Sequence, residues 1–204
     1  MSQQAEDTRP FAPACERNRG PILEVLREHL PARVEVFEIA SGTGQHAVHF
    51  ASRWPELRWQ CSDLPERLPG IQAWLAEGDP QQLPAPLPLD ALHGPWPART
   101  YDAVFTANSF HIMPWAGVEA VFKGLTGRLK PQGQLIVYGP FRLQGRFVSA
   151  SDAEFDASLQ ARDESMGLRD LEAVDALATR AGLVRRARHA MPANNHCVVW
   201  QREA

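Results

Sequence analysis

A glycine-rich turn between a β-rich run and an amphipathic segment constrains the fold of this chain more than any other feature of its sequence. The run at 34–39, Val-Glu-Val-Phe-Glu-Ile, predicts a strand that ends at small residues and at Gly42 and Gly44. Beyond the glycines, apolar residues recur at the spacing of one helix face: Ala47, Phe50, Ala51 and Trp54. A strand, a tight glycine turn and a helix in this order are typical of the first unit of an α/β sheet.

The alternation of strand and helix signals continues along the chain. Further strands are predicted at 57–61, around 87–89, at 101–106 and at 135–138. Further helices are predicted at 21–30, 71–76, 118–129 and 171–181, the last capped by Asp170. Strands that alternate with helices pair in parallel through right-handed crossovers. The final β-rich runs, 183–189 and 197–200, are joined by too short a connection for a crossover, so we expect the last strand to be antiparallel.

These signals predict a three-layer, Rossmann-like α/β sandwich with a mostly parallel, seven-stranded sheet. We expect all 204 residues to form a single domain (1–204), with an N-terminal segment at 1–20. The polar stretch at 141–169 is too long for a connecting loop and is interpreted as an inserted, lid-like segment with short helices.

Composition restricts the classes of partner. The net charge of −3 argues against a nucleic-acid partner. The three cysteines, Cys15, Cys61 and Cys197, are too far apart to suggest a disulfide framework or a zinc site, and we expect no metal. Residues 1–10 lack the apolar core of a leader peptide, and no later stretch is long and apolar enough to span a membrane. We therefore expect a cytoplasmic monomer or homodimer.

The glycine turn suits the close approach of a ligand to the backbone at the start of a helix. Its sequence, Gly42-Thr43-Gly44-Gln45-His46-Ala47, also satisfies the G-x-G-x-x-A dinucleotide fingerprint, so the glycines alone fit a dinucleotide enzyme. Glu38 separates the two interpretations, because dinucleotide enzymes keep an apolar residue at that position. A carboxylate there suits a ligand with an ammonium group, such as the methionine end of S-adenosylmethionine. As a ligand-facing side chain, Glu38 is expected to affect binding and not stability.

Other polar residues follow the predicted strands at the same edge of the sheet. Asp63 ends the second strand, where a carboxylate accepts hydrogen bonds from ribose hydroxyls in both cofactor classes. Asp90 ends the third strand, within reach of an adenine amino group, and Asn108 follows the fourth, where the reacting methyl group would lie. Each also has a plainer interpretation, as a turn or loop residue. His46 is interpreted as a helix-surface residue.

Five stretches make the chain similar to a known family: Glu16-Arg17-Asn18, Glu38 to His46, Tyr138-Gly139-Pro140-Phe141, Gly167 to Glu172, and Met191 to Asn195. The chain resembles the class I, Rossmann-like S-adenosylmethionine-dependent methyltransferases. More narrowly, it resembles the DUF938 family of methyltransferase-like proteins, also grouped as methyltransferase-like protein 26. The resemblance runs from about residue 13 to residue 200 and implies the class I methyltransferase sandwich.

The resemblance implies S-adenosyl-L-methionine as cofactor. The positions expected to contact it are Arg17, Asn18, Glu38, Ala40, Ser41, Gly42, Thr43, Gly44, Asp63, Leu64, Asp90, Ala91 and Asn108. Ala40 departs from the general E/D-x-G-x-G-x-G motif, where a glycine stands. Alanine is compatible with close approach if its φ angle is negative.

The expected activity is methyl transfer to an acceptor whose identity the sequence does not give. A base is needed only if the acceptor must lose a proton, and His111 and Tyr138 are then the expected catalytic residues, with Asp152 as a further candidate. A small-molecule acceptor is expected beneath the insertion, in a pocket lined by aromatic residues: Trp96, Phe110, Trp115, Phe141 and Phe147.

Two other functions remain open from the sequence. An NAD-dependent oxidoreductase would use Gly42, Gly44 and Ala47, with Asp63 on the ribose. A non-catalytic S-adenosylmethionine-binding scaffold module would keep the fold and the cofactor without methyl transfer.

Overall fold

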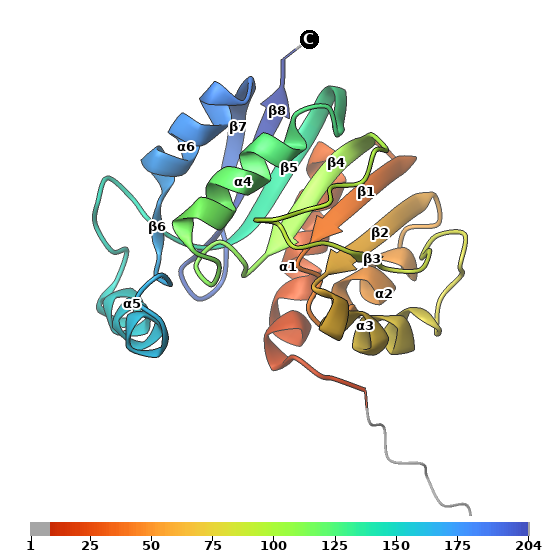
Figure 1. Ribbon diagram of the computed structural model, residues 1–204, viewed down its shortest axis with the longest axis horizontal. Helices are drawn as coiled ribbons and strands as arrows, with labels where there is room; N and C mark the ends of the chain where they lie inside the picture. Colours follow the sequence, from red (N-terminus) through yellow and green to blue (C-terminus); the bar gives the residue numbers. More distant parts are fainter. Residues whose placement is uncertain (1–8, 204) are drawn as a thin grey trace, which may run out of the picture.

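The computed structural model describes residues 9–203, so residues 1–8 of the expected N-terminal segment lie outside the described part. Within that part the chain forms an eight-stranded sheet in the order β3-β2-β1-β4-β5-β8-β7, with β6 paired to β5 off this path (Figure 1). The strands are β1 (Val34–Ile39), β2 (Leu57–Asp63), β3 (Leu87–Pro88), β4 (Tyr101–Ala107), β5 (Leu129–Arg142), β6 (Arg169–Asp170), β7 (Leu183–Ala190) and β8 (Asn195–Arg202).

The pairing directions confirm the predicted sheet. β1 pairs in parallel with both β2 and β4, β2 with β3, and β4 with β5. β8 is antiparallel to its two neighbours, β5 and β7. The main path has the seven strands expected, and β6 is the addition that the sequence did not indicate.

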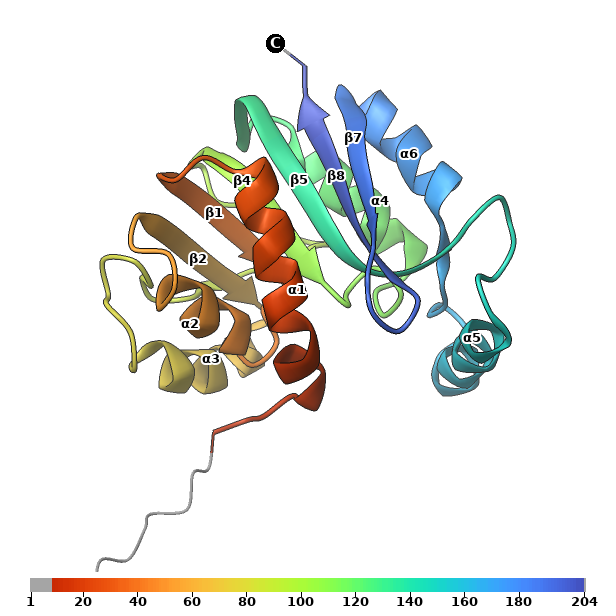
Figure 2. The ribbon, with the colours of Figure 1, turned by 180° about the vertical axis from the view of Figure 1, so that it is seen from behind.

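Helices cover both faces of the sheet, which makes the three layers. They are α1 (Pro13–His29), α2 (Gln45–Ala51), α3 (Leu68–Leu75), α4 (Trp115–Leu125), α5 (Ala150–Arg162) and α6 (Leu171–Arg180), with a 3-10 turn at Pro65–Arg67. α1, α2 and α3 share one apolar core with the sheet, and α4 and α6 share the other (Figures 1 and 2). Alternate residues of β1 supply the two cores: Val34 and Val36 face α1, while Phe37 and Ile39 face α4. No helix in residues 9–203 is long and apolar enough to span a membrane.

The first helix begins earlier than predicted. The expected helix at 21–30 is the second half of α1, which starts at Pro13 and continues through the polar stretch Glu16–Gly20 and through Pro21. The first half lacks the apolar periodicity of a core-facing helix, because polar side chains hold it. Among them, Asn18 is buried against α2.

The strand predicted at 135–138 is much longer in the structure. β5 begins at Leu129 and passes through Pro131-Gln132-Gly133, residue types that are typical of a turn. Gln132 has a φ angle of +63°, and the register with β4 shifts between Tyr101 and Ala103. The irregularity is thus a bulge within the strand. α4 correspondingly ends at Leu125, so Leu129 belongs to the sheet and not to that helix.

The insertion contains one helix where several short ones were expected. Its first two residues, Phe141 and Arg142, belong to β5 and pair with β6, which closes the base of the segment. α5 fills the middle and is capped by the hydroxyl of Ser149, which accepts the Asp152 N–H. Arg169 then ties the base to the loop after β4: its Nε donates to the carbonyl of Phe110 at 2.9 Å, and its Nη2 to that of Met113 at 2.6 Å.

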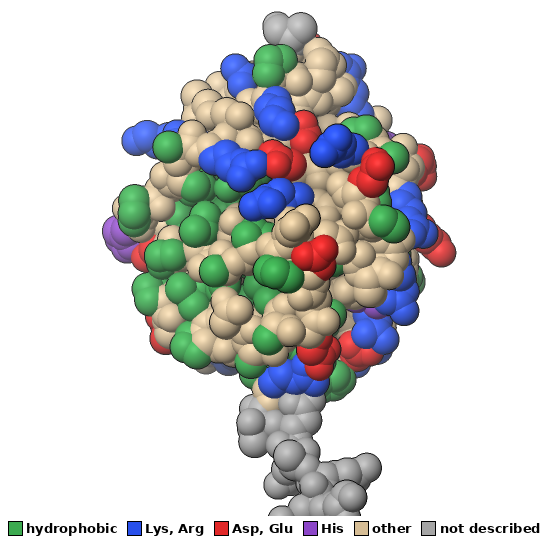
Figure 3. Space-filling model, turned by 90° about the vertical axis from the view of Figure 1, so that its right-hand side faces the viewer, with side chains coloured by type: hydrophobic (Ala, Val, Ile, Leu, Met, Phe, Trp, Pro, Cys, Tyr) green, Lys and Arg blue, Asp and Glu red, His purple; other side chains and the backbone are tan. Residues whose placement is uncertain are grey.

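The opposite edge of the sheet is formed by β3, which has only two residues. Prolines are dense on either side of it, between residues 80 and 97, and proline lacks the N–H that strand pairing needs. Figure 3 looks onto this edge and shows hydrophobic side chains gathered in its lower left part, with Lys and Arg above them. A short, proline-flanked edge limits pairing with another sheet.

We expect Arg169→Met to loosen the insertion. The substitution removes donors from the carbonyls of Phe110, Met113 and Ser165, and hydrogen bonds from a charged donor contribute about 1.5–3 kcal/mol each. The free energy of unfolding in urea should fall by about 2 kcal/mol or more, and a protease should cleave faster within 143–168. The control is Arg162→Met at the exposed end of α5. Equal stability of the two variants would contradict this account of the insertion.

Candidate functional site

The turn at residues 40–44 joins β1 to α2 through three left-handed backbone positions. The φ angles are +55° at Ala40, +64° at Gly42 and +87° at Gly44. A Cβ at Gly44 would lie 3.2 Å from the side chain of Ile71, so this glycine permits close packing on α3. A Cβ at Gly42 would meet nothing within 4 Å. The turn therefore presents the backbone of Gly42 to open space at the carboxyl edge of the sheet.

Ala40 corrects one expectation from the sequence. A negative φ was the condition for alanine to replace the usual glycine, and the observed φ is +55°. In the left-handed region the Cβ of an L-residue approaches the following carbonyl oxygen, at a cost of about 1–2 kcal/mol. Ala40 therefore holds the first position of the turn under backbone strain, while the rest of the loop keeps glycine where φ is positive.

Glu38 lies beneath this turn and not in open space. It is 1% exposed, and its Oε2 accepts hydrogen bonds from Trp59 Nε1 at 2.8 Å and from Cys61 Sγ at 3.5 Å. Burial raises the pKa of its carboxyl group to about 7, against the effect of hydrogen bonds from Trp59 and Ser41. Truncating this side chain would leave the Trp59 N–H unpaired, so the expectation that Glu38 affects only binding no longer holds.

His46 on α2 is the buried neighbour of Glu38. It is 4% exposed, which corrects its interpretation as a helix-surface residue. Its Nε2 lies 2.7 Å from Asn18 Oδ1, and its Nδ1 lies 4.0 Å from Glu38 Oε1. Burial lowers the pKa of His46 to about 4. Between about pH 4 and pH 7 the imidazole and the carboxyl group are therefore both mainly uncharged, so the pair is not an ion pair in that range.

The first half of α1 is attached directly to the glycine turn. Glu16 Oε1 accepts a hydrogen bond from Gln45 Nε2 at 3.0 Å. Gln45 Oε1 in turn accepts from the backbone N–H of Ala12 at 2.6 Å and from the Thr43 hydroxyl at 2.9 Å. Arg17 lies exposed on the same helix. The turn is thus enclosed by the helix that precedes β1 in the chain, a contact that only the resemblance at residues 16–18 suggested.

Asp63 ends β2 beside the open side of the turn. Its Oδ2 accepts the Gly42 N–H at 2.7 Å, and its Oδ1 accepts the Leu64 N–H at 2.8 Å. Burial raises the pKa of Asp63, while these two N–H groups act in the opposite direction. Ser41 is buried behind them, its hydroxyl accepting the Ser62 N–H, whereas Leu64 is 38% exposed. The structure therefore brings Gly42, Asp63 and Leu64 together as predicted.

Asp90 follows β3 and is held by its own loop. Its Oδ2 lies 2.7 Å from His93 Nδ1, and its Oδ1 accepts the Leu92 N–H at 2.8 Å. The hydrogen bond with His93 is the main cause that lowers the pKa of Asp90. Ala91 packs against the core shared with α4. Both residues lie after the β3 strand, as expected, and Asp90 keeps a charged carboxylate at neutral pH.

His111 and Tyr138 lie on opposite faces of β5. A Cβ at Gly139 would lie 3.7 Å from His111 Nδ1. Gly139 lies on the same face of β5 as Val137, two residues earlier, and that face packs toward α4. Tyr138 instead belongs to the core that faces α1, and its hydroxyl is hydrogen-bonded to Asn18. Burial raises the pKa of Tyr138. The two residues expected to be catalytic are therefore not brought together by the fold.

His111 lies against the insertion. It is buried, its ring contacts that of Phe155 on α5 at 5.6 Å between centroids, and its carbonyl accepts the Gly167 N–H. Burial is the main cause that lowers the pKa of His111 to about 4, and the positive charge of Arg169 acts in the same direction. The imidazole is thus neutral near pH 7. Asn108 precedes it with a φ of +53° and donates its N–H to the Tyr138 carbonyl at 2.8 Å.

The aromatic residues expected to line an acceptor pocket are mostly core residues. Phe110 and Phe141 are buried in the core beneath α4 and α6, and Trp96 and Trp115 pack against it. Only Phe147 is exposed among the five. Aromatic residues are common both in an apolar core and in the lining of a ligand pocket. The sequence therefore did not show which of the two roles these residues have.

Sequence reasoning missed Asn194 and undervalued Asp152. Asp152 is 7% exposed on the inner face of α5, and Asn194 Nδ2 donates to its Oδ1 at 3.3 Å. Its second carboxylate oxygen, Oδ2, has no hydrogen-bond partner within the described residues. Asn194 belongs to the stretch at 191–195 that carried the family resemblance, which was the one available signal.

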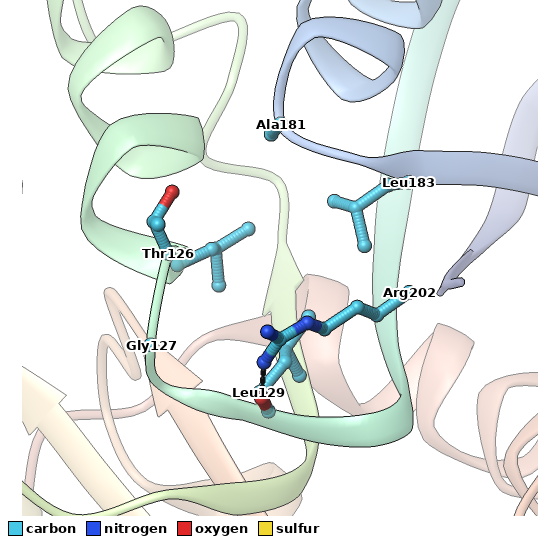
Figure 4. Close-up of a pocket in the computed structure, with 7 residues that line it drawn as sticks. Thr126, Gly127, Leu129, Ala181, Leu183 and Arg202 are labelled. Carbon is cyan, nitrogen blue, oxygen red and sulfur yellow. Dashed lines mark hydrogen bonds between the residues drawn. The ribbon is translucent and has the colours of Figure 1, made fainter. Parts of the chain in front are cut away.

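A small pocket lies at the other, amino-terminal edge of the sheet. Figure 4 shows its lining by Thr126, Gly127, Leu129, Ala181, Leu183 and Arg202. Its volume is about 60 Å³, room for a few water molecules only. This pocket is too small for a cofactor the size of S-adenosylmethionine.

Solved structures share this fold over nearly the whole chain. An O-methyltransferase family protein from Burkholderia thailandensis matches with a TM-score of 0.80 and 20% identity, covering 94% of this chain and 58% of that one. Human N-acetylserotonin methyltransferase in complex with SAM matches with a TM-score of 0.76 and 16% identity, covering 94% and 53%. A methyltransferase of calicheamicin biosynthesis in its SAH-bound form gives 0.72 and 15%, covering 92% and 54%. The chain thus spans little more than half the length of these proteins.

The class defined by these matches is the methyltransferase-like α/β fold, mostly parallel with antiparallel C-terminal strands. The sequence matches the family described as "Protein of unknown function (DUF938)" over residues 9–202. This chain belongs to the DUF938 family.

We expect Ala40→Gly to stabilise the protein. Glycine removes the left-handed strain of about 1–2 kcal/mol but loses more chain entropy on folding, so the net gain should be about 0.5–1 kcal/mol. Urea unfolding measures it. The matched control is Ala76→Gly at the exposed end of α3, where φ is −61° and the same change should destabilise. A loss of stability in Ala40→Gly would show that the strain is absent.

We expect His46→Asn to reduce the loss of stability in acid. A histidine whose folded pKa is about 4 contributes stability that is present above its unfolded pKa near 6.5 and is lost as the pH falls toward 4. Over that range the loss due to His46 should be about 2 kcal/mol. Glu38 acts oppositely, because its raised pKa lowers stability as the pH rises from about 4.5 to 7. Urea unfolding at pH 6.5 and 4.5 compares wild type, His46→Asn and the exposed-site control His93→Asn. Equal losses in wild type and His46→Asn would disprove the burial effect.

Proposed function

We propose that this chain is an S-adenosylmethionine-dependent methyltransferase that acts on a small-molecule acceptor. The observation that supports it best is the open side of Gly42, next to the Asp63 carboxylate, at the carboxyl edge of the sheet. Ligands of open α/β sheets bind at this edge. The similar structures named in complex with SAM or in SAH-bound form add a cofactor class to the fold, at 15–16% identity.

The residues present fit this cofactor. Gly42 at φ +64° leaves room for a ligand against the backbone, and the carboxylate of Asp63 is a suitable acceptor for vicinal hydroxyls. Leu64 offers an exposed apolar surface beside it, and Asp90 lies one strand further along the same edge. Glu38 lies beneath the turn, and its hydrogen bonds with Trp59 and Ser41 hold the end of β1 and the turn in place. The family resemblance adds Asn108 and the α1 residues Arg17 and Asn18 to the residues proposed to contact the cofactor.

When bound, the cofactor supplies a methyl group already activated by a positive sulfur. The chain's own residues then need only orient the acceptor and exclude water. The insertion serves this second task, since Arg169 fastens its base to the loop that carries His111. If the acceptor must release a proton, the neutral imidazole of His111 accepts it, and its low pKa makes that acceptance weak. Such a base suits an acceptor that is already nucleophilic.

The acceptor site is proposed at the end of β5, between His111 and α5. Phe155 contributes an aromatic ring there, and the unpartnered Oδ2 of Asp152 is a buried hydrogen-bond acceptor. A buried oxygen without a partner favours a ligand, or a water, that donates to it. A small molecule with a hydroxyl or amino group therefore fits better than a nucleic acid, which the net charge of −3 also disfavours.

Gly42→Ala tests the cofactor site. Its Cβ would meet no atom of the protein within 4 Å, although the positive φ strains an alanine there, so the methyl group takes up space that the ligand would occupy. Calorimetric titration should show S-adenosylmethionine binding at least about tenfold weaker than in wild type, the effect of about 1.4 kcal/mol. Gly127→Ala is a matched control at the opposite edge, with φ +79° and nothing within 4 Å, so it adds the same backbone strain without touching the site.

The same titrations distinguish the alternative functions. Binding of NADH with no binding of S-adenosylmethionine would overturn the proposal in favour of an oxidoreductase. Transfer of a labelled methyl group to the small-molecule fraction of a cell extract supports a methyltransferase. Cofactor binding without transfer to any fraction would favour the scaffold module, and transfer only to the macromolecular fraction would overturn the small-molecule acceptor.

A further inference from the structure

Two histidines that are distant in the sequence converge where the end of α1 meets β7. The Nε2 atoms of His29 and His189 lie 2.7 Å apart, and their ring centroids lie 5.0 Å apart with an interplanar angle of 70°. The carboxylate of Glu28 approaches the same point, with its Oε1 3.7 Å from His29 Nε2. The ligand atoms of the three side chains lie within 4.8 Å of one another.

The cluster has no part in the proposed methyl transfer. His29 lies eleven positions after Asn18 in α1, which is about 16 Å along a helix. His189 lies on β7, the terminal strand of the sheet path, and pairs with Cys197 in β8. Neither the turn at 40–44 nor the insertion contributes to it.

The two imidazoles are held in place by backbone structure. Gln134 Nε2 on β5 donates to the carbonyl of His29 at 2.9 Å, which fixes the last turn of α1 against the sheet. The β7–β8 ladder fixes His189. Both rings are half-buried, while Glu28 is exposed. Two fixed nitrogen ligands with one movable carboxylate form a largely preformed site.

We propose that His29, His189 and Glu28 bind a divalent transition metal of the zinc type. Zinc takes imidazole nitrogen at about 2.0–2.1 Å and carboxylate oxygen at a similar distance, and a His₂Glu set leaves one position for water. Tetrahedral ligands of one such ion lie about 3.3 Å apart, so the two nitrogens separate by about half an ångström when the ion enters. Without an ion, the same atoms share a proton in an N–H···N hydrogen bond.

The bound ion joins the C-terminal end of α1 to β7. α1 is the helix whose first half encloses the glycine turn through Glu16 and Asn18. A metal ion that binds only the folded chain stabilises it in proportion to its concentration over Kd. The site is therefore structural, and its effect is read as thermal stability.

Titration of the full chain, free of any histidine tag, with ZnCl₂ tests the site. We expect one saturable site with a dissociation constant below about 100 µM by calorimetry. The melting temperature should rise by about 4 °C at ten times that concentration. MgCl₂ should leave it unchanged, because magnesium prefers oxygen ligands. His189→Gln and Glu28→Gln change surface positions of the cluster and should each weaken zinc binding, the former by at least about tenfold.

His93→Gln is the matched control. His93 pairs with Asp90 at 2.7 Å on the exposed loop after β3, so it also offers an imidazole beside a carboxylate. Zinc affinity and the melting shift should be unchanged in this variant. No saturable binding up to about 1 mM, unchanged affinity in His189→Gln, or loss of binding in His93→Gln would each overturn the proposal. None of these outcomes depends on S-adenosylmethionine binding.

Discussion

Glu38 ends β1 beneath the glycine turn, and its carboxyl group is enclosed by Trp59, Ser41 and Cys61. An isolated buried carboxylate is costly, so the folded protein raises the pKa of this group to about 7 and supplies donors for its oxygens. The strand end and the turn are fixed together by these bonds. The left-handed φ angles at Ala40, Gly42 and Gly44 then direct the backbone of Gly42 outward toward Asp63. The open side of the turn therefore depends on a side chain that is itself buried beneath the turn.

The same buried cluster explains why residues before β1 take part in the site. The buried ring of His46 on α2 needs a hydrogen-bond partner, and Asn18 on α1 provides it. Glu16, also on α1, accepts a hydrogen bond from Gln45 at the start of α2. The stretches that gave the family resemblance at residues 16–18 and 38–46 thus contact each other in space. Asn194, from the stretch at 191–195, contacts Asp152 on α5 in a similar way. The first two bonds join α1 to α2 and the third joins the β7–β8 turn to α5, so that they provide partners for buried polar groups.

The sheet and its strand directions were predictable because apolar periodicity and short connections determine them. The positions of Gly42, Asp63 and Asn108 at one edge follow from the same rule. The start of α1 was not predictable, since its first half is held by polar contacts of Asn18 and Glu16 with residues distant in the sequence. The length of β5 was hidden by Pro131 and Gly133, which signal a turn locally but form a bulge against β4. The orientation of Glu38 also required the structure, because a strand-end residue faces either helix layer according to register.

α1 links the two ends of this arrangement, and Pro21 divides it. Proline at that position has no N–H to donate to the Arg17 carbonyl, which removes one hydrogen bond from the helix interior. Rigidity is therefore weakest between the half that contacts the glycine turn and the half that ends at His29. Each half has its own attachment: Asn18 to His46 on one side, and the His29 carbonyl to Gln134 on the other. Each half is therefore held by its own contact, one to α2 and one to β5, and these contacts on both sides of Pro21 compensate for the hydrogen bond that the proline lacks.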